Sequence, residues 1–435
     1  MVGSKPPRIG VTTAASSVGM LVEAYDFLLF GFVAVILGKL FFPPTPNPVT
    51  AALNALLVFG AGFLMRPVGG ILFSYIADKV GRKIAFIITI TTMGISMLGI
   101  GLSPTYSEIG ILATILLIIF RLLQGLSLGG EFGSATVFLQ EHVPAERRGL
   151  YNALLQTGWT IGPILVFFTL LANSLFLSSQ ALLSYGWRIP FLVGAVLVVI
   201  GAIMRFFVKE TPVFTHYKEK GEVTDNPIVI AFRKVWKEIL MIFIIMVFQG
   251  SLYYGTLVAP FTLWLTYLKI PLTTSIISFI IINVIVTVFM ILTGYLSDKY
   301  GRRPIIRWGY LLAGILLLPL FSVFTMTKDI VILTLVTLPP AIFGIAMFTV
   351  LTVFFAEVFP ANVRVSDNIG FQFGQAIGGF APYITTYLFS STNNLLLSFA
   401  YVAVGSLIVS LISWLWMPET KGWDYLRTIP KLAKK

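Results

Sequence analysis

The stretch from residue 121 to residue 149, RLLQGLSLGGEFGSATVFLQEHVPAERRG, decides the fold class of this chain. It begins inside an apolar run and ends in a charged turn, and it places Arg121 and Glu131 at depths where a bilayer would lie. A charge near the middle of a membrane costs about 2.5–3.5 kcal/mol on insertion scales, so the protein must compensate both groups. On a helix, Arg121, Gln124 and Glu131 fall within an arc of about 80°, which indicates one polar face.

Three glycines follow a second stripe of the same helix. Gly125, Gly129 and Gly133 recur at four-residue spacing beside the polar face. Small residues at this spacing let a second membrane helix approach closely. We therefore expect one flank of the helix to face water and the next to pack against another span.

Composition places the whole chain in a membrane. Of its 435 residues, 57% are hydrophobic and 11% are charged, against about 25% charged residues in a soluble domain. Apolar runs of about 20 residues follow one another, each long enough to span ~30 Å of hydrocarbon, whereas a β-barrel would show alternating segments of ~10 residues. We therefore predict an all-α membrane protein with twelve spans, at 14–38, 51–77, 84–103, 109–138, 150–174, 188–208, 237–264, 272–297, 304–325, 329–356, 365–389 and 394–417.

The distribution of charge predicts the orientation of these spans. The net charge of +12 comes from basic residues in short loops, and most of them lie on the side shared by both termini. This is the positive-inside bias, so we expect a protein of the plasma membrane with both termini in the cytoplasm. A nucleic-acid partner is rejected for the same reason. The expected partners are the lipid bilayer, protons and a small-molecule substrate, and the expected state is a monomer.

An enzyme is not expected. The chain has no cysteine, which excludes disulfides, thiolate catalysis and cysteine-ligated metals, and its two histidines, His142 and His216, lie in loops. A membrane enzyme would need a nucleophile with its base, or a metal cluster. We predict neither a metal nor a cofactor.

The two halves of the chain repeat each other. SYIADKVGRK at 74–83 recurs as GYLSDKYGRR at 294–303, and EHVPAERR at 141–148 recurs as EVFPANVR at 357–364. Transporters are often built from such repeats, with the substrate between the halves. We therefore divide the chain into an N-terminal six-helix bundle, a hydrophilic cytoplasmic linker and a C-terminal six-helix bundle, at 1–208, 209–236 and 237–435.

These motifs resemble those of the major facilitator superfamily. The sequence at 74–83 is similar to that family's G-x3-D-[RK]-x-G-[RK]-[RK] loop, with Ser74 in place of the first glycine. EAYDF at 23–27, RPVGG at 66–70 and the segment at 124–131 further resemble the metabolite:proton symporters of that superfamily. The resemblance implies the major facilitator fold, two pseudo-symmetric bundles of six helices that rock around a central site to give alternating access.

The resemblance also assigns a gating role to charged loop residues. Asp78, at a helix end, would bind basic groups of the neighbouring bundle and hold the outward-facing state, and its counterparts would form similar cytoplasmic clasps. The expected gating residues are Asp78, Arg82, Glu141, Arg148, Asp298, Arg302, Glu357 and Arg364.

Asp26 is the expected proton carrier. It lies about twelve residues, or ~18 Å, into the first span, and the resemblance pairs it with Arg121. A neighbouring guanidinium favours the charged form of a carboxylate, whereas burial favours the neutral form. A conformational change that alternates these two effects would bind and release a proton. The alternative is a fixed structural ion pair.

Arg66 and Glu131 form a second set of charges at similar depth, about 15–18 Å from the cytoplasm. Either the two groups face each other, or Arg66 binds an anionic substrate while Glu131 titrates, since an arginine fork suits a carboxylate. The alternative is a pair that only locks two helices together. The expected proton-coupling residues are Asp26, Arg121, Glu131 and Arg66.

The substrate candidates are mostly neutral. The C-terminal half shows no charge in the middle of a span, so its hydrogen-bonding and aromatic side chains would complete a site whose ion coupling lies in the N-terminal half. Gln249 and Tyr253 are one turn apart and could share a face, as could Gln372 and Gln375. The candidates are Tyr25, Arg66, Gln124, Gln156, Gln249, Tyr253, Tyr254, Asn283, Gln372 and Gln375.

Two functions fit these residues. The first is a secondary active transporter that couples protons to the symport of a small polar organic solute, in particular a carboxylate or a zwitterion. The second is a sugar or polyol transporter, because Gln156 and Gln249 stand near the positions of sugar-binding glutamines in the similar sugar porters. However, span ten reads TVLTVF at 349–354, without the Gly-Pro and Trp of those porters, which argues against a hexose pocket.

Overall fold

The computed structural model describes residues 9–80, 82–131, 136, 139–140, 143–206, 233–324, 326–359 and 367–423, and no strand occurs within these ranges. The first half contains α1 (Ile9–Phe32), α2 (Ala34–Phe41), α3 (Pro48–Lys79), α4 (Arg82–Leu102), α5 (Tyr106–Ile109), α6 (Ile111–Glu131), the 3-10 turn η1 (Ala145–Arg147), α8 (Arg148–Gln156), α9 (Gly158–Phe176), α10 (Ser179–Ala181), the π-helical turn η2 (Leu182–Gly186) and α11 (Arg188–Phe206).

The second half contains α14 (Trp236–Thr266), α15 (Leu272–Tyr300), α16 (Arg302–Val323), α17 (Ile330–Val358), α18 (Asp367–Gly378), α19 (Ala381–Thr392) and α20 (Leu395–Leu415). Most of the linker predicted at 209–236 lies outside the described residues, so the domain boundaries stay a prediction.

Each predicted span coincides with a helix or with a broken pair of helices. Within the described ranges, eight helices are long and apolar enough to cross a bilayer. Two bent pairs bring the number to ten, α1 with α2 at 60° and the α10–η2 segment with α11 at 44°. The apolar part of α4, Ile87–Leu102, and the pair α18–α19 occupy the two remaining predicted spans.

The break between α18 and α19 has a local cause. Gly378 and Gly379 lack the side chains that would collide with α14 and with the ring of Phe63, respectively. Pro382, in the first turn of α19, has no backbone N–H to continue a helix from the preceding turn. The chain therefore bends at this point, and Phe380 reaches Gly60 on α3.

The predicted glycine seam packs α6 against α3. A Cβ on Gly125 would overlap the carbonyl oxygen of Gly62, and a Cβ on Gly129 would overlap that of Arg66. The seam is therefore confirmed for these two glycines, while Gly133 lies outside the described residues. Its effect is to hold Arg66 and the polar face of α6 at fixed relative positions.

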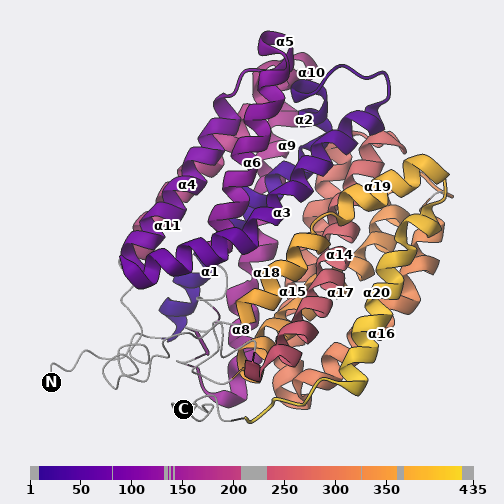
Figure 1. The fold of residues 1–435 in the computed structure, drawn as a ribbon. Coiled ribbons are helices and arrows are strands. Elements are labelled where there is room, and N and C mark those ends of the chain that lie inside the picture. The colour runs from indigo at the N-terminus through magenta and orange to yellow at the C-terminus, as the bar shows by residue number, and fades with distance from the viewer. Residues whose placement is uncertain are drawn as a thin grey trace.

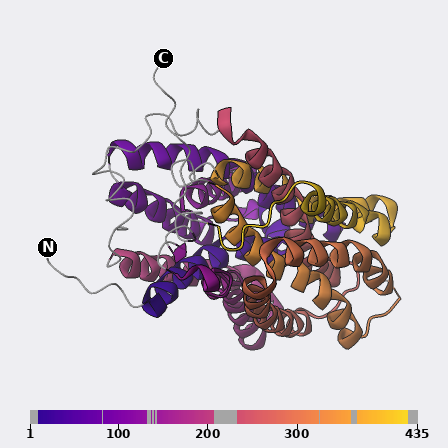
Figure 2. The same ribbon diagram turned by 90° about the horizontal axis from the view of Figure 1, so that it is seen from below.

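The helices gather into two groups that follow the two halves of the sequence (Figures 1 and 2). Helices α1 to α11 lie on one side and α14 to α20 on the other, with contacts between them through α3 and α18, α9 and α15, and α8 and α17. α1 begins and α20 ends at the same end of the molecule, at the bottom of Figure 1. That end is called the terminal face below.

Candidate functional site

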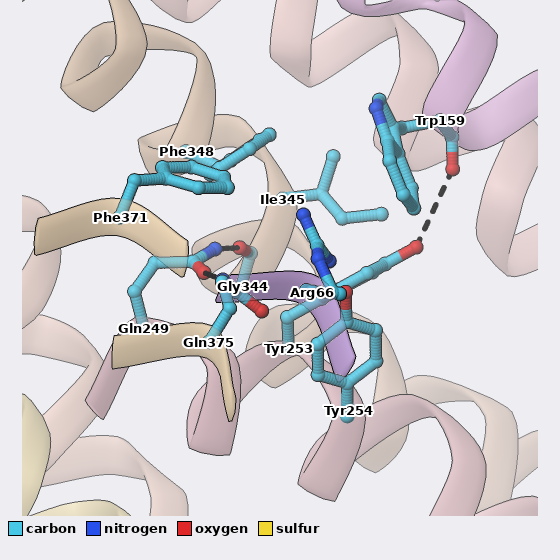
Figure 3. A pocket seen from close by; sticks show the side chains of 10 residues that line it. All are labelled: Arg66, Trp159, Gln249, Tyr253, Tyr254, Gly344, Ile345, Phe348, Phe371 and Gln375. Carbon is cyan, nitrogen blue, oxygen red and sulfur yellow. Dashed lines mark hydrogen bonds between the residues drawn. The ribbon is translucent and has the colours of Figure 1, made fainter. Parts of the chain in front are cut away.

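A cavity lies between the two groups of helices (Figure 3). Two of its walls come from the first half, on α3 and α9, and the others from α14, α17 and α18. Its described lining combines one guanidinium, two amides and several aromatic rings, and includes no carboxylate. The lining residues are Arg66, Trp159, Gln249, Tyr253, Tyr254, Gly344, Ile345, Phe348, Phe371 and Gln375.

Arg66 supplies the positive charge of the cavity and is 1% exposed. Its Nε donates a 2.8 Å hydrogen bond to Oε1 of Gln372 on α18. The guanidinium carbon lies 5.7 Å from the ring centroids of both Phe63 and Phe371. The charge is therefore held by an amide of the opposite bundle and by aromatic faces, which favour cations. Glu131 is the partner predicted for Arg66, and its side chain lies outside the described part of the structure.

A row of amides forms one wall of the cavity. Nε2 of Gln249 donates to the carbonyl oxygen of Gly344 at 2.9 Å, and Nε2 of Gln375 donates to Oε1 of Gln249 at 3.2 Å (Figure 3). A backbone carbonyl only accepts, so it fixes the orientation of both amides. Oε1 of Gln375 is consequently left without a hydrogen-bond partner among the described residues. The row of amides therefore ends in an oxygen atom that can accept a hydrogen bond.

Asp26 and Arg121 lie at a second, enclosed site, with Gln124 between them. Nε2 of Gln124 donates to Oδ1 of Asp26 at 2.7 Å, and Oε1 of Gln124 accepts from Nη1 of Arg121 at 3.1 Å. Arg121 also donates to the backbone oxygens of Phe27 and Phe59, both at 3.2 Å. The resemblance pairs Asp26 with Arg121; here the carboxylate acts electrostatically on Arg121, and the amide of Gln124 forms hydrogen bonds with both.

The remaining substrate candidates lie away from the cavity lining. The hydroxyl of Tyr25 donates to Pro190 at 2.8 Å within the first half, and Nδ2 of Asn283 donates to Phe279 of its own helix at 2.8 Å. Nε2 of Gln156 donates to a threonine hydroxyl of α17 at 3.4 Å. Gln124 serves the Asp26 site and Gln372 holds the arginine of the cavity, so a substrate role for these five side chains stays a prediction.

Sequence reasoning did not find most of the aromatic walls of the cavity. Trp159, Phe348 and Phe371 stand in spans with many apolar residues, and their spacing gives no sign that they converge. Glu23 was quoted within a motif but not selected, although it is 2% exposed and acts electrostatically on Arg66. Glu23 could have been selected from the sequence, because an ionisable residue within a predicted span is a functional candidate.

The charged residues of the second half join the two bundles near the terminal face. Both carboxylate oxygens of Asp298 accept from backbone N–H groups at the start of α8, from Gly149 at 2.7 Å and from Leu150 at 2.8 Å. An acidic group at a helix N-terminus is favourable because unpaired N–H groups point outward there. The contact of Asp298 with the start of α8 is called the clasp below. Arg302 lies 2.8 Å from Asp298 and 3.0 Å from Glu357, so a buried charge network supports the clasp.

A second layer of contacts lies between this clasp and the cavity. Arg148 of α8 approaches Glu357 of α17 at 3.8 Å. One turn further along α8, Nδ2 of Asn152 donates to the backbone oxygen of Thr349 at 2.9 Å and to the hydroxyl of Thr352 at 2.8 Å. The bundles are therefore joined on the terminal-face side of the cavity. The other predicted gating residues fall outside the described residues or side chains: Asp78, Arg82, Glu141 and Arg364.

Comparison with known proteins gives a consistent result. The family model described as Major Facilitator Superfamily matches residues 27–381. The glycine betaine/proline/ectoine/pipecolic acid transporter OusA of Dickeya dadantii is 32% identical, over 95% of this chain and 84% of that protein. The proline/betaine transporter of Escherichia coli K12 is also 32% identical, over 93% of this chain and 83% of that protein.

Solved structures agree on the fold. The proton:xylose symporter XylE bound to 6-bromo-6-deoxy-D-glucose superposes with a TM-score of 0.77, covering 96% of this chain and 98% of that one at 18% identity. An inward-open structure of XylE from Escherichia coli gives a TM-score of 0.69 at 19% identity. At this level of identity the likeness establishes the architecture and leaves the substrate open.

Proposed function

Because the chain belongs to the major facilitator superfamily and is a multi-pass membrane transporter, we propose that it couples protons to the symport of a small zwitterionic or anionic organic solute by alternating access. One observation carries the proposal. The described lining of the cavity between the bundles holds a single guanidinium, that of Arg66, among aromatic rings and amides, and no carboxylate. Such a lining selects a substrate with a negative group.

The chemistry of the cavity favours a carboxylate joined to a compact cation. Arg66 presents a planar fork that suits a carboxylate. The faces of Trp159, Tyr253 and Tyr254 suit an ammonium or methylammonium group, which aromatic rings attract. The relatives are named for glycine betaine, proline, ectoine and pipecolic acid, each of which combines a carboxylate with a nitrogen cation.

Coupling is assigned to the Asp26 site. Asp26 is 2% exposed and Arg121 is fully buried, so a carboxylate there gains or loses a proton only when a conformational change alters its contacts. In the proposed cycle, Asp26 is protonated when the cavity opens outward and deprotonated after it opens inward. Arg121 favours the charged form and thereby release of the proton.

The positive-inside rule supports a cytoplasmic terminal face. The contacts of Asp298 and Asn152 would then seal the cytoplasmic side of the cavity. Breaking these contacts would be the step that opens the cavity inward, and forming them would hold the outward-facing or occluded state. The protein would work in the plasma membrane with both termini in the cytoplasm.

A sugar or polyol carrier is the second candidate, and the amide row of Gln249 and Gln375 favours it, since amides suit hydroxyl groups. The experiment is uptake into proteoliposomes of radiolabelled glycine betaine, proline, succinate and xylose, with and without an inside-alkaline pH gradient. We expect uphill accumulation of a carboxylate-bearing solute that a protonophore abolishes. Accumulation of xylose alone would favour the second candidate, and uptake indifferent to the gradient would contradict symport.

A further inference from the structure

The amide of Gln124 connects the two charged groups of the proposed proton site. Its Nε2 lies 2.7 Å from Oδ1 of Asp26, and its Oε1 lies 3.1 Å from Nη1 of Arg121. The side chain of Gln124 is fully buried. Nε2 also donates to Sδ of Met97 at 3.3 Å, so both N–H groups of the amide are in use.

The partners of the amide dictate its orientation. A guanidinium only donates hydrogen bonds, so Oε1 must face Arg121 and the NH₂ group must face Asp26. An ionised Asp26 accepts that bond as a charge-assisted one, about twice as strong as a bond between neutral groups. The orientation seen here is therefore the one that suits an ionised carboxylate.

Protonation of Asp26 changes which orientation of the Gln124 amide is favoured. The carboxyl group then carries an O–H donor, and the charge-assisted bond becomes a weaker neutral one. Gln124 can accept from the new O–H only by turning its amide, which withdraws Oε1 from Arg121 and gives up the bond to Met97. One amide thus has two orientations, and the charge on Asp26 selects between them.

Arg121 itself is fixed more firmly than the amide. Its guanidinium carbon lies 3.9 Å from the ring centroid of Phe27, 4.8 Å from that of Phe30 and 4.7 Å from that of Phe59. A Cβ on Gly62 would lie 2.7 Å from Nε of Arg121, so the glycine leaves the space that the guanidinium occupies. The amide, rather than the arginine, is therefore the part that can turn.

From this geometry we infer that Gln124 is a positioning residue that transmits the protonation state of Asp26 to Arg121, and the inference rests on the proposed role of Asp26 as proton carrier. Turning of the amide removes the acceptor that Gln124 offers Arg121 within α6, gives up the bond to Met97 on α4 and replaces the bond to Asp26 on α1. Proton binding thereby changes the contacts of α6 with α1 and α4, while Arg121 keeps its backbone acceptors on α1 and α3. Gln124 is not among the residues that line the cavity, so its assigned role is in coupling.

Other charges act on this network from several elements. Arg66 of α3 and Tyr254 of α14 act on Arg121, and Tyr25 of α1 interacts with Asp26. Glu23 of α1 acts in turn on Arg66. All of them are kept in the variants used below. A change in proton binding between variants therefore reports on the amide.

Infrared difference titration of the full chain in proteoliposomes, without substrate, tests the inference. The carboxyl stretching band of Asp26 is identified as the band that Asp26→Asn removes. In Gln124→Leu, we expect the midpoint of that band to rise by at least one pH unit, a tenfold change in proton affinity, because the charge-assisted bond is lost. Gln124→Glu, which keeps a polar group of the same length, should raise the midpoint too, since a second carboxylate repels the charge on Asp26.

A buried glutamine elsewhere supplies the control. Gln140 is 1% exposed, and neither of its amide atoms has a hydrogen-bond partner among the described residues. Gln140→Leu should leave the midpoint where it is. A band that Asp26→Asn removes, with the same midpoint in both Gln124 variants as in the parent, would overturn the inference and leave the proton carrier intact. A titration with no band assignable to Asp26 would overturn the proton carrier itself.

Discussion

Arg66 on α3 donates a 2.8 Å hydrogen bond from Nε to Oε1 of Gln372 on α18, and this bond joins the two bundles at the wall of the cavity. Nε2 of Gln372 in turn donates to the backbone oxygen of Gly129 on α6 at 3.3 Å. The cation proposed to bind substrate is thus shared between the halves that must move apart. A carboxylate that binds Arg66 acts directly on a contact between the bundles.

Replacing Arg66 with lysine keeps the charge and removes the planar fork. Lysine cannot hold Gln372 and a substrate carboxylate from separate edges of one group. Losing one charged hydrogen bond, worth about 1.5–3 kcal/mol, predicts a KM at least tenfold higher for the transported carboxylate. Uptake kinetics in proteoliposomes measure this KM.

The matched control is Arg307→Lys, on the outer side of α16 where the guanidinium stacks on Trp414 at 3.6 Å. Its KM should equal that of the parent. An Arg66→Lys protein with an unchanged KM would show that Arg66 does not contact the substrate.

Gln375 should discriminate between substrates that carry N–H groups and those that do not. Its buried Oε1 has no hydrogen-bond partner among the described residues and can accept from a substrate N–H. In Gln375→Leu, we expect proline, a secondary amine, to lose at least tenfold more apparent affinity than glycine betaine, which has no N–H. Competition against a common radiolabelled substrate gives both affinities, and equal losses would exclude this role.

Removing Asp298 should open the terminal face. Asp298→Ala deletes two charged hydrogen bonds to α8, which predicts a shift of the conformational equilibrium of at least tenfold. The chain has no cysteine, so Thr349→Cys, behind the Asn152 contact, provides a single site for maleimide labelling. Its labelling rate should rise at least tenfold in Asp298→Ala.

Asp329→Ala is the control for this experiment, because Asp329 caps the N-terminus of α17 and its hydrogen bonds within the described residues are all local. That variant should label at the parent rate. Equal labelling of the Asp298 and Asp329 variants would mean that the clasp does not hold the bundles together.

The glycine seam should be sensitive to a single methyl group. In Gly129→Ala the new Cβ would overlap the backbone oxygen of Arg66, and overpacking of this kind costs about 1–3 kcal/mol. We expect a Tm several degrees lower and a loss of uptake, because Arg66 is displaced. At Gly94 the nearest atom to a new Cβ is 3.5 Å away, on Val198, so Gly94→Ala should melt and transport as the parent does. Identical melting of the two variants would contradict the seam.

The arrangement of spans could be predicted from the sequence because it depends on local properties. Hydrophobic length sets each span, and the four-residue spacing of Gly125 and Gly129 predicted a close helix contact that the structure contains. The break between α18 and α19 was missed inside the span predicted at 365–389. Glycine is needed at Gly378 and Gly379 because α14 and Phe63 pack against them, and both are remote in the sequence.

The site was harder to predict because it depends on which side chains converge. Gln124 and Gln249 are both buried glutamines in apolar spans, yet one lies at the Asp26 site and the other lines the cavity. Helical periodicity places each residue on a face of its own helix and gives no information about the partner of that face. Charged site residues were easier to predict, because a charge within a span needs a partner or a function wherever it lies.

The most direct test of the central claim compares two modes of transport in Asp26→Asn. Exchange of labelled for unlabelled substrate at equal pH needs substrate binding and bundle motion, whereas uphill uptake also needs a proton site. We predict that Asp26→Asn retains exchange but accumulates no substrate above the outside concentration under an inside-alkaline pH gradient, while Asp329→Asn does both. Full uphill accumulation by Asp26→Asn would contradict the assignment of proton coupling to this site.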